Sequence, residues 1–153
     1  MKVVAFNGSA RRNGNTAILV RHLFGVLEAE GIECELFQMA GHAIRGCRAC
    51  ARCVDAKDRR CHWDDDPINE YIAAMDAADG IVLASPTYFA DVSAEMKAVI
   101  DRVGYVARAN DDMLGRKIGA AVVAVRRAGS IHAFDTINHF FFISQMVVPG
   151  SRY

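Results

Sequence analysis

Four of the five cysteines crowd into a short stretch of the chain, where their spacing suits a metal cluster. Cys47, Cys50 and Cys53 form a C-x2-C-x2-C run, and Cys61 follows it. In a reducing compartment such a group more often serves as a metal or redox site than as a disulfide framework. A compact run with a fourth cysteine is how one segment folds around a [4Fe–4S] cluster, although four thiolates also hold zinc or remain free thiols. All three interpretations stay open at this point.

A second group of residues has the donors that bind a phosphate. It lies in residues 7–16, between an apolar run and a helical pattern. The side-chain donors of this loop are Ser9, Arg11, Asn15 and Thr16. Donors concentrated at a helix start favour phosphate binding over a plain glycine-rich turn. The loop has neither a G-x-G-x-x-G fingerprint nor the lysine of a Walker A motif, which excludes both of those sites.

The elements that must position these residues alternate between strand and helix. Short apolar runs predict strands at residues 2–7, 32–36, 80–84, 117–125 and 146–148. Apolar residues at helical spacing predict helices at residues 15–30, 68–75, 92–103 and 131–144. The second strand alternates apolar and acidic residues, so it belongs at an edge of the sheet. The pattern predicts an α/β, doubly wound, five-stranded parallel sheet of order 2-1-3-4-5, without a final helix before the chain ends.

Local signals predict helix ends and buried faces. Asp66 is expected to cap the helix that begins with Pro67, and Ser130 to cap the last helix. The positions expected to face the core from the first helix are Leu19, Leu23, Val26 and Leu27. The fourth strand is expected to be buried on both faces. Residues 140–143 are four large apolar residues in a row, more than one core-facing stripe can bury, which predicts a homodimer or homotetramer.

Composition limits the class of protein. The chain has 153 residues, 52% of them apolar, with 18 basic and 18 acidic side chains. These values are typical of one globular domain, expected to span residues 1–153 with a cysteine-rich insertion at about residues 40–65. A net charge of zero argues against a nucleic-acid binder, and no apolar run is long enough for a membrane span. No signal-peptide core precedes the first strand, so a cytoplasmic location is expected.

Two loops carry a resemblance to a known family. The sequence G-S-x-R-x-x-G-N-T at residues 8–16 resembles the FMN-phosphate loop of the flavodoxin-like NADPH-dependent FMN reductases. The sequences S-P-T-Y-F at 85–89, V-S-A-E-M-K at 92–97 and I-D-R at 100–102 resemble the second signature of that family. The resemblance covers nearly the whole chain. The cysteines make it most similar to the iron–sulfur flavoproteins, whose compact cysteine motif lies in the same connection.

The resemblance implies that FMN is the cofactor and that two further loops surround its ring. One loop, at the end of the third strand, supplies a rigid turn, a hydroxyl and two aromatic rings: Pro86, Thr87, Tyr88 and Phe89. The other, after the fourth strand, is implied to contact the flavin mainly through its backbone: Arg126, Arg127, Ala128 and Gly129. An arginine there is suited to stabilising negative charge on the reduced ring, and Gly129 permits close approach.

The implied function is an FMN-dependent oxidoreductase that passes electrons between a [4Fe–4S] cluster, FMN and a small-molecule acceptor. No side chain need act as a catalytic acid or base, because the flavin carries the redox chemistry. NAD(P)H or a reduced ferredoxin-like protein would be the electron donor. The alternatives are a cluster-free NAD(P)H-dependent FMN or quinone reductase, a non-enzymatic flavodoxin-type electron carrier and a zinc-stabilised binding module.

Overall fold

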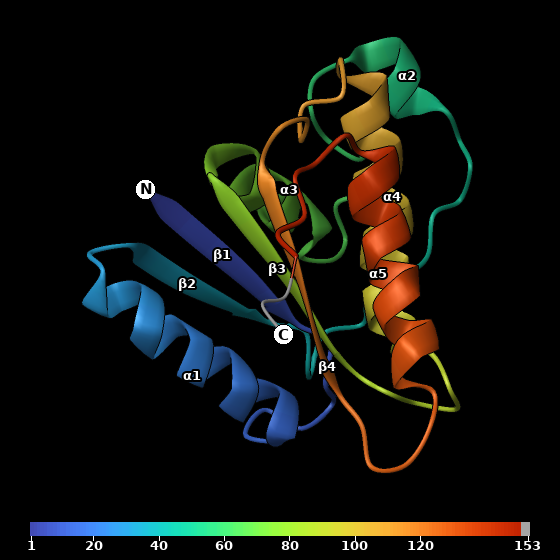
Figure 1. The fold of residues 1–153 in the computed structure, drawn as a ribbon. Coiled ribbons are helices and arrows are strands. Elements are labelled where there is room, and N and C mark those ends of the chain that lie inside the picture. Colours follow the sequence, from blue (N-terminus) through green and yellow to red (C-terminus); the bar gives the residue numbers. More distant parts are fainter. Residues whose placement is uncertain (151–153) are drawn as a thin grey trace.

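The computed structural model describes residues 1–150 as a parallel β-sheet with helices on both faces (Figure 1). The strands are β1 (Lys2–Asn7), β2 (Glu33–Gln38), β3 (Gly80–Pro86) and β4 (Ile118–Ala124). The helices are α1 (Asn15–Ala29), α2 (Arg52–Ala56), α3 (Ile68–Ala77), α4 (Ala94–Ala109) and α5 (Ser130–Ile143). In the described part, α1 covers one face of the sheet, and α3, α4 and α5 cover the other.

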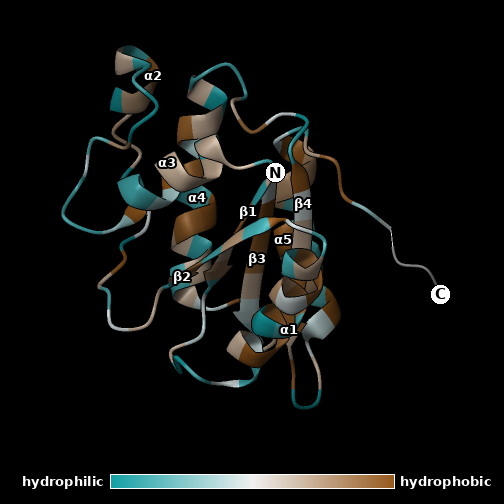
Figure 2. Ribbon diagram, turned by 90° about the vertical axis from the view of Figure 1, so that its left-hand side faces the viewer, coloured by the Kyte–Doolittle hydropathy of each residue, from teal (hydrophilic) through white to brown (hydrophobic). Residues whose placement is uncertain are grey.

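The sheet has the order β2-β1-β3-β4, with every pair parallel, so the predicted order is confirmed for these four strands. The half-polar β2 lies at an edge, as its alternation of glutamates with apolar residues predicted. All seven residues of the inner strand β3 are buried. Figure 2 shows hydrophobic residues along the inner strands and on the helix sides that face them. The fold therefore brings the carboxyl ends of β1, β3 and β4 to one edge of the sheet.

The predicted fifth strand is not seen in residues 1–150. Val147 makes an isolated parallel bridge with Ile118, and its backbone N–H and C=O form two 2.9 Å bonds with Lys117 O and Gly119 N. This bridge lies beside β4, where the fifth strand was expected. Pro149 follows almost at once, and proline cannot donate to a strand ladder. The expectation of a missing final helix concerns the chain after Val148 and reaches residues 151–153, which lie outside the described residues.

Strand β4 is less buried than predicted. Ile118 is exposed, and most of the strand is half-buried rather than buried on both faces. The reason is that β4 forms a ladder with β3 on one side and only the single Val147 bridge on the other.

The prediction of which face of α1 is buried is wrong, because a neighbouring face of the helix contacts the sheet. The residues that face the sheet are Thr16, Ala17, Val20 and Phe24. Leu19 and Val26 are exposed, whereas Leu23 and Leu27 pack only partly against the core. Ala17 and Val20 are small, so α1 can lie close to the sheet, and one residue of difference turns a helix by about 100°. The apolar stripes of α3 and α4 are buried as predicted.

Two predicted helix caps are displaced by one residue. The N-cap of α3 is Pro67, although Asp66 Oδ1 still accepts a hydrogen bond from Ile68 N (3.2 Å). The N-cap of α5 is Gly129, in a left-handed conformation, and not Ser130. The five-residue helix α2 lies inside the predicted cysteine-rich insertion. Among the described helices, none is both long enough and apolar enough to cross a membrane.

Candidate functional site

The loop between β1 and α1 is held in place by side chains of two neighbouring strands. Asn7 Oδ1 accepts a hydrogen bond from Ser9 N, and Gln38 Nε2 donates to Ser9 O, both at 3.0 Å. Asn7 Nδ2 also donates to Gln38 Oε1 (2.7 Å). The buried hydroxyl of Ser9 accepts from Arg11 N (3.1 Å). These bonds preorganise the backbone of the loop.

The first turn of α1 presents backbone N–H groups without a side-chain cap. Its N-cap residue, Gly14, is extended and makes no side-chain hydrogen bond. A Cβ added at Gly14 would lie 3.1 Å from the Cβ of Arg11, so the loop packs tightly there. Thr16 is buried in this turn, whereas Arg11 and Asn15 are exposed. Uncapped N–H groups at the positive end of a helix form an arrangement that binds an anion.

The same loop shares one cavity with the loops that follow β3 and β4, here called the strand-end cavity. Its volume is about 540 Å³. The predicted cofactor residues that line it are Ser9, Arg11, Asn15, Thr16, Pro86, Thr87, Tyr88 and Arg126. Ala124 and Val125 line it as well. Ala124 was not predicted to line the site, although it lies near the carboxyl end of a predicted strand. A hydrogen bond from Thr87 N to Ala124 O (2.9 Å) joins the loop after β3 to the end of β4.

Thr87 has an unusual environment within this cavity. Its hydroxyl is buried and has no hydrogen-bond partner among the described residues. A buried hydroxyl without a partner costs free energy, and a bound ligand or water would satisfy it. Thr87 is therefore the side chain of the cavity that most directly signals a missing polar partner.

Four predicted cofactor residues do not line the strand-end cavity: Phe89, Arg127, Ala128 and Gly129. Phe89 is fully exposed. Phe89 and Ala90 both have left-handed backbone conformations, with φ of 50° and 70°. Backbone strain of this kind collects at functional sites, and Phe89 projects into solvent beside the cavity instead of forming its wall.

Asp91 attaches the loop after β3 to helix α5. Thr136 Oγ1 donates to Asp91 Oδ1 (2.9 Å), and His132 Nε2 lies 3.4 Å from Asp91 Oδ2. Burial alone would raise the pKa of Asp91, but the Val92 N–H, Thr136 and His132 together hold it below its ordinary value. Helix α5 thus fixes the position of the loop that carries Thr87.

All four clustered cysteines line a second cavity, here called the cysteine cavity: Cys47, Cys50, Cys53 and Cys61. None of them forms a disulfide. Burial raises the pKa of the Cys53 thiol, and the charges of Cys61, Cys47 and Cys50 add to this increase, which outweighs a lowering by a backbone hydrogen bond. The other three cysteines therefore lie within electrostatic reach of Cys53.

The cysteine cavity does not have the form of a site for one ion. Within residues 1–150, no three His, Cys, Asp or Glu side chains are arranged to hold a single metal ion. A structural zinc site would need four ligands around one point. In a [4Fe–4S] cluster each thiolate binds a different iron, so the sulfurs surround the cluster without meeting at one point, and this donor set fits the cluster.

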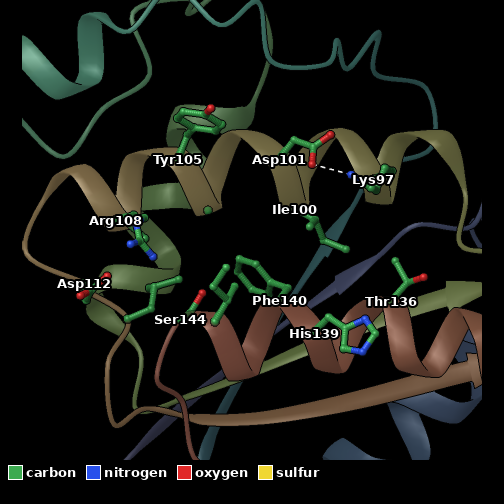
Figure 3. Close-up of a pocket in the computed structure, with 14 residues that line it drawn as sticks. Lys97, Ile100, Asp101, Tyr105, Arg108, Asp112, Thr136, His139, Phe140 and Ser144 are labelled. Atoms are coloured by element: carbon green, nitrogen blue, oxygen red, sulfur yellow. Dashed lines mark hydrogen bonds and ion pairs between the residues drawn. The ribbon is translucent and has the colours of Figure 1, made fainter.

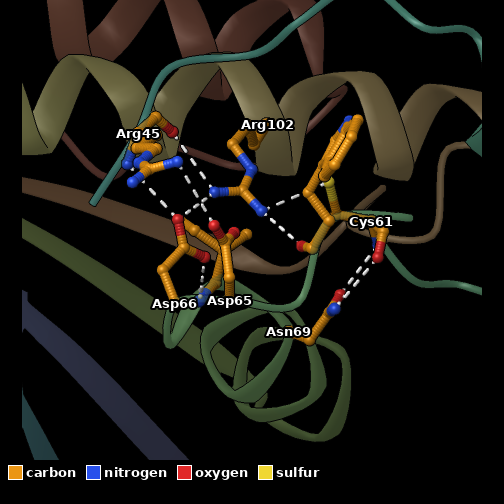
Figure 4. Close-up of polar contacts among 8 residues, drawn as sticks. Arg45, Cys61, Asp65, Asp66, Asn69 and Arg102 are labelled. Carbon is orange, nitrogen blue, oxygen red and sulfur yellow. Dashed lines mark hydrogen bonds and ion pairs between the residues drawn. The ribbon is translucent and has the colours of Figure 1, made fainter. Parts of the chain in front are cut away.

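A buried arginine of α4, which sequence reasoning did not assign to the site, anchors the cysteine segment (Figure 4). Arg102 forms a buried ion pair with Asp66 and donates to Arg45 O (3.2 Å). Its Nη2 donates to Trp63 O (2.6 Å) and to Cys61 Sγ (3.3 Å). Burial alone would lower the pKa of Arg102, but hydrogen bonds to Cys61 and Asp66 raise it overall. The I-D-R sequence at residues 100–102 was the one signal that pointed to it.

Comparison with known proteins identifies the family. Residues 1–153 match the family described as NADPH-dependent FMN reductase. The chain belongs to the NADPH-dependent FMN reductase family. An iron–sulfur flavoprotein of Methanocaldococcus jannaschii is 36% identical over 159 residues, which cover 99% of this chain and 77% of the relative.

Solved structures with lower sequence identity to this chain share its fold. RosB, solved with bound 8-demethyl-8-formylriboflavin-5'-phosphate, has a TM-score of 0.74 at 19% identity; the match covers 97% of this chain but only 62% of RosB. A flavodoxin from the domain Archaea has a TM-score of 0.65 at 16% identity, covering 99% of this chain and 80% of the flavodoxin. The fold is therefore flavodoxin-like.

The FMN reductase family implies FMN, and the strand-end cavity fits it. The uncapped start of α1 and the exposed Arg11 provide donors for a phosphate. The unsatisfied hydroxyl of Thr87 provides a polar contact, and the half-exposed ring of Tyr88 an apolar surface. These features come from different loops around one space, as a nucleotide-sized ligand requires.

The two cavities lie toward opposite ends of α4. Its N-cap, Ser93, adjoins the end of β3, where Ser93 N donates to Ser85 Oγ (3.0 Å). Tyr105, on the same helix, lines the cysteine cavity. At 1.5 Å per residue the helix rises about 18 Å from Ser93 to Tyr105. In Figure 1, α2 lies beside the end of α4 that is distant from the β4–α5 loop.

Another cavity of the described chain belongs to neither site. It lies between α4 and α5, with a volume of about 700 Å³ (Figure 3). Ile100 and Phe140 give it apolar walls, while Lys97, Asp101 and Arg108 surround them with charge. None of the predicted cofactor residues or cysteines lines it.

Proposed function

We propose that this protein is an FMN-dependent oxidoreductase of the iron–sulfur flavoprotein type, which passes electrons between a [4Fe–4S] cluster, FMN and a small-molecule acceptor. The observation that carries the proposal is that all four cysteines of the compact motif line one cavity. The family supports FMN as the cofactor, and the name of the M. jannaschii relative supports the cluster.

The chain's contribution at the strand-end cavity is binding and orientation. Bound FMN supplies the redox chemistry, because a flavin exchanges one or two electrons. Ser9, Arg11, Asn15 and Thr16 would hold its phosphate together with the N–H groups of α1. Thr87 and Tyr88 would contact the ring. We assign no acid or base to a side chain of this cavity.

The chain's contribution at the cysteine cavity is a set of thiolate ligands. The cluster, when bound, supplies one-electron transfer. Exposed arginines near the cysteines, among them Arg48, Arg52 and Arg60, favour an acidic protein such as a ferredoxin-like donor. NAD(P)H is the other donor, as the name of the family suggests.

A second candidate function is a cluster-free NAD(P)H-dependent FMN or quinone reductase. Cys47 and Cys50 are exposed. This exposure favours the cluster-free reductase, because solvent-facing thiols need no metal to be stable. In this case the cysteine segment would carry free thiols, while the strand-end cavity would act unchanged.

Analysis of protein purified without oxygen distinguishes these functions. The visible spectrum, together with flavin, iron, sulfide and zinc determination, should show FMN and one [4Fe–4S] cluster per chain. FMN without iron and sulfide would establish the cluster-free reductase in its place. Zinc without flavin would contradict both functions.

A further inference from the structure

We infer that Arg102 positions the Cys61 ligand and raises the reduction potential of the cluster. The inference rests on the proposed function, because it concerns the cluster that the four cysteines would bind. Arg102 acts here through a cysteine and the backbone around it, so it is a positioning residue rather than a catalytic one.

Arg102 joins the two ends of the cysteine segment. It donates to Arg45 O before the first cysteine, and to Trp63 O and Asp66 after the last. The side chains of Arg102 and Asp66 are each only 2% exposed. Removing one partner of such a buried pair leaves an uncompensated charge, so the two side chains hold each other in place. One residue of α4 thereby closes the segment into a loop.

Cys61 is held at both its backbone and its sulfur (Figure 4). Cys61 N donates to Asn69 Oδ1 (2.7 Å), and Asn69 Nδ2 donates to Cys61 O (2.9 Å). Arg102 Nη2 donates to the sulfur at 3.3 Å. Asn69 belongs to α3 and Arg102 to α4, so two helices of the core fix this one ligand.

The middle of the segment has fewer contacts with the core: Arg59 N donates to Asn110 Oδ1 (3.0 Å), and Cys53 packs partly against the core. Helix α2 has five residues and none of them is buried. Ala49, Ala51 and Lys57 all have left-handed backbone conformations, with φ of 51°, 57° and 49°. Such conformations are unfavourable for non-glycine residues. The ends of the segment fixed by Arg102 therefore help to define where the other three sulfurs lie.

The contact with Cys61 is also electrostatic. In the described part of the chain, Cys61 is the one clustered cysteine whose sulfur accepts from a charged donor; Cys47 Sγ accepts from Ala49 N (3.4 Å). One-electron reduction adds a negative charge to the cluster and its thiolates. A buried cation beside a ligand sulfur stabilises that more negative state, so the potential rises. Asp66 opposes this effect, because its carboxylate pairs with the other terminal nitrogen of the guanidinium.

Two charge changes of opposite sign test the inference. Asp66→Asn removes a negative charge while its amide oxygen can still accept from Arg102, so the cluster potential should rise. The double variant Arg102→Gln with Asp66→Asn leaves no unpaired buried charge and removes the cation. Relative to Asp66→Asn, the double variant should shift the reduction equilibrium at least tenfold toward the oxidised cluster. For one electron, this corresponds to a reduction potential lower by at least 59 mV. Arg108→Gln removes an exposed charge from the same helix and should leave the potential unchanged.

The measurement is a potentiometric titration of the anaerobically purified holoprotein, followed by the electron paramagnetic resonance of the reduced cluster. Iron content and circular dichroism report whether each variant is intact. If wild type, Asp66→Asn and an intact double variant have equal potentials, Arg102 has only a structural role and the inference is overturned. If the double variant loses its cluster, Asp66→Asn decides alone, and an unchanged or lower potential overturns the inference. Wild-type protein with FMN but no iron or sulfide would instead contradict the proposed function itself, before any variant is compared.

Discussion

The backbone of Ala90 occupies the space that a side chain on Gly129 would need. A Cβ added at Gly129 would lie 2.5 Å from the Ala90 Cα and 2.9 Å from the Thr87 Cγ2. Gly129 also has a φ of 89°, a conformation that glycine adopts far more readily than other residues. The turn after β4 thus packs directly against the turn after β3. Residues of both turns line the strand-end cavity, so this contact sets its shape.

We therefore expect Gly129→Ala to damage both stability and FMN binding. The strained backbone and the clash should lower the free energy of unfolding by about 1–3 kcal/mol. FMN affinity should fall because the two turns must separate. Gly25→Ala is the matched control: it lies in α1, its Cβ meets nothing within 4 Å, and it should stabilise the protein by up to about 1 kcal/mol. Urea unfolding and FMN titration measure both effects, and equal FMN affinities in the two variants would contradict the role of Gly129.

Four of the five predicted strands are present, and they were predictable because their signals are local. Apolar runs and the alternation of Glu33 and Glu35 with apolar residues identify strands and an edge without any knowledge of packing. The buried face of α1 was not predictable in this way, since Leu19 and Val20 are both apolar and only packing decides which one faces the sheet. The loops of the strand-end cavity were predictable because parallel strands end at one edge.

Arg102 shows where prediction from sequence stops. Its contacts with Cys61, Asp66 and Arg45 span 41, 36 and 57 residues of sequence. No local pattern shows that an arginine on an amphipathic helix will be buried, because its ion-pair partner belongs to another element. Phe89 shows the same limit, since its aromatic type suggested a cavity wall while the turn geometry projects it into solvent.

Arg11 should contribute to FMN binding through the phosphate. It lines the strand-end cavity at the uncapped start of α1. A charge-assisted hydrogen bond is worth about 1.5–3 kcal/mol, so Arg11→Ala should weaken FMN binding by this amount. Arg12→Ala is the control, because the Arg12 guanidinium donates to Ala40 O (3.1 Å) instead. Titration of apoprotein with FMN and riboflavin checks this; an equal loss for both ligands would show that Arg11 does not contact the phosphate.

We also expect a homodimer or homotetramer. Phe140 and Phe141 are buried, but Phe142 and Ile143 are 57% and 65% exposed at the end of α5. An apolar patch of this kind is stabilised when a second copy covers it. Sedimentation at micromolar concentration should show an oligomer that Phe142→Glu converts to smaller species. Val26→Glu, on the opposite face of the sheet, should not; a monomeric wild type would refute the expectation.

Cys50→Ser tests whether the cysteines bind the cluster that the proposed function requires. Cys50 lines the cysteine cavity, and if each thiolate holds one iron, a serine there should remove most of the iron and sulfide. FMN content should stay near that of the wild type, because the strand-end cavity contains no cysteine and lies toward the other end of α4. Electron entry from a one-electron protein donor should fall sharply, while chemical reduction of the flavin should persist.

Cys34→Ser is the control for a general effect of losing a thiol. Cys34 lies on β2, and its sulfur donates to Ile32 O (3.7 Å), outside the cysteine cavity. This variant should keep its iron, its sulfide and its FMN. Iron and sulfide analysis of anaerobic preparations compares the two variants directly. If Cys50→Ser and Cys34→Ser keep the same iron content, Cys50 is not a ligand, and the cluster-free reductase becomes the better description of this protein.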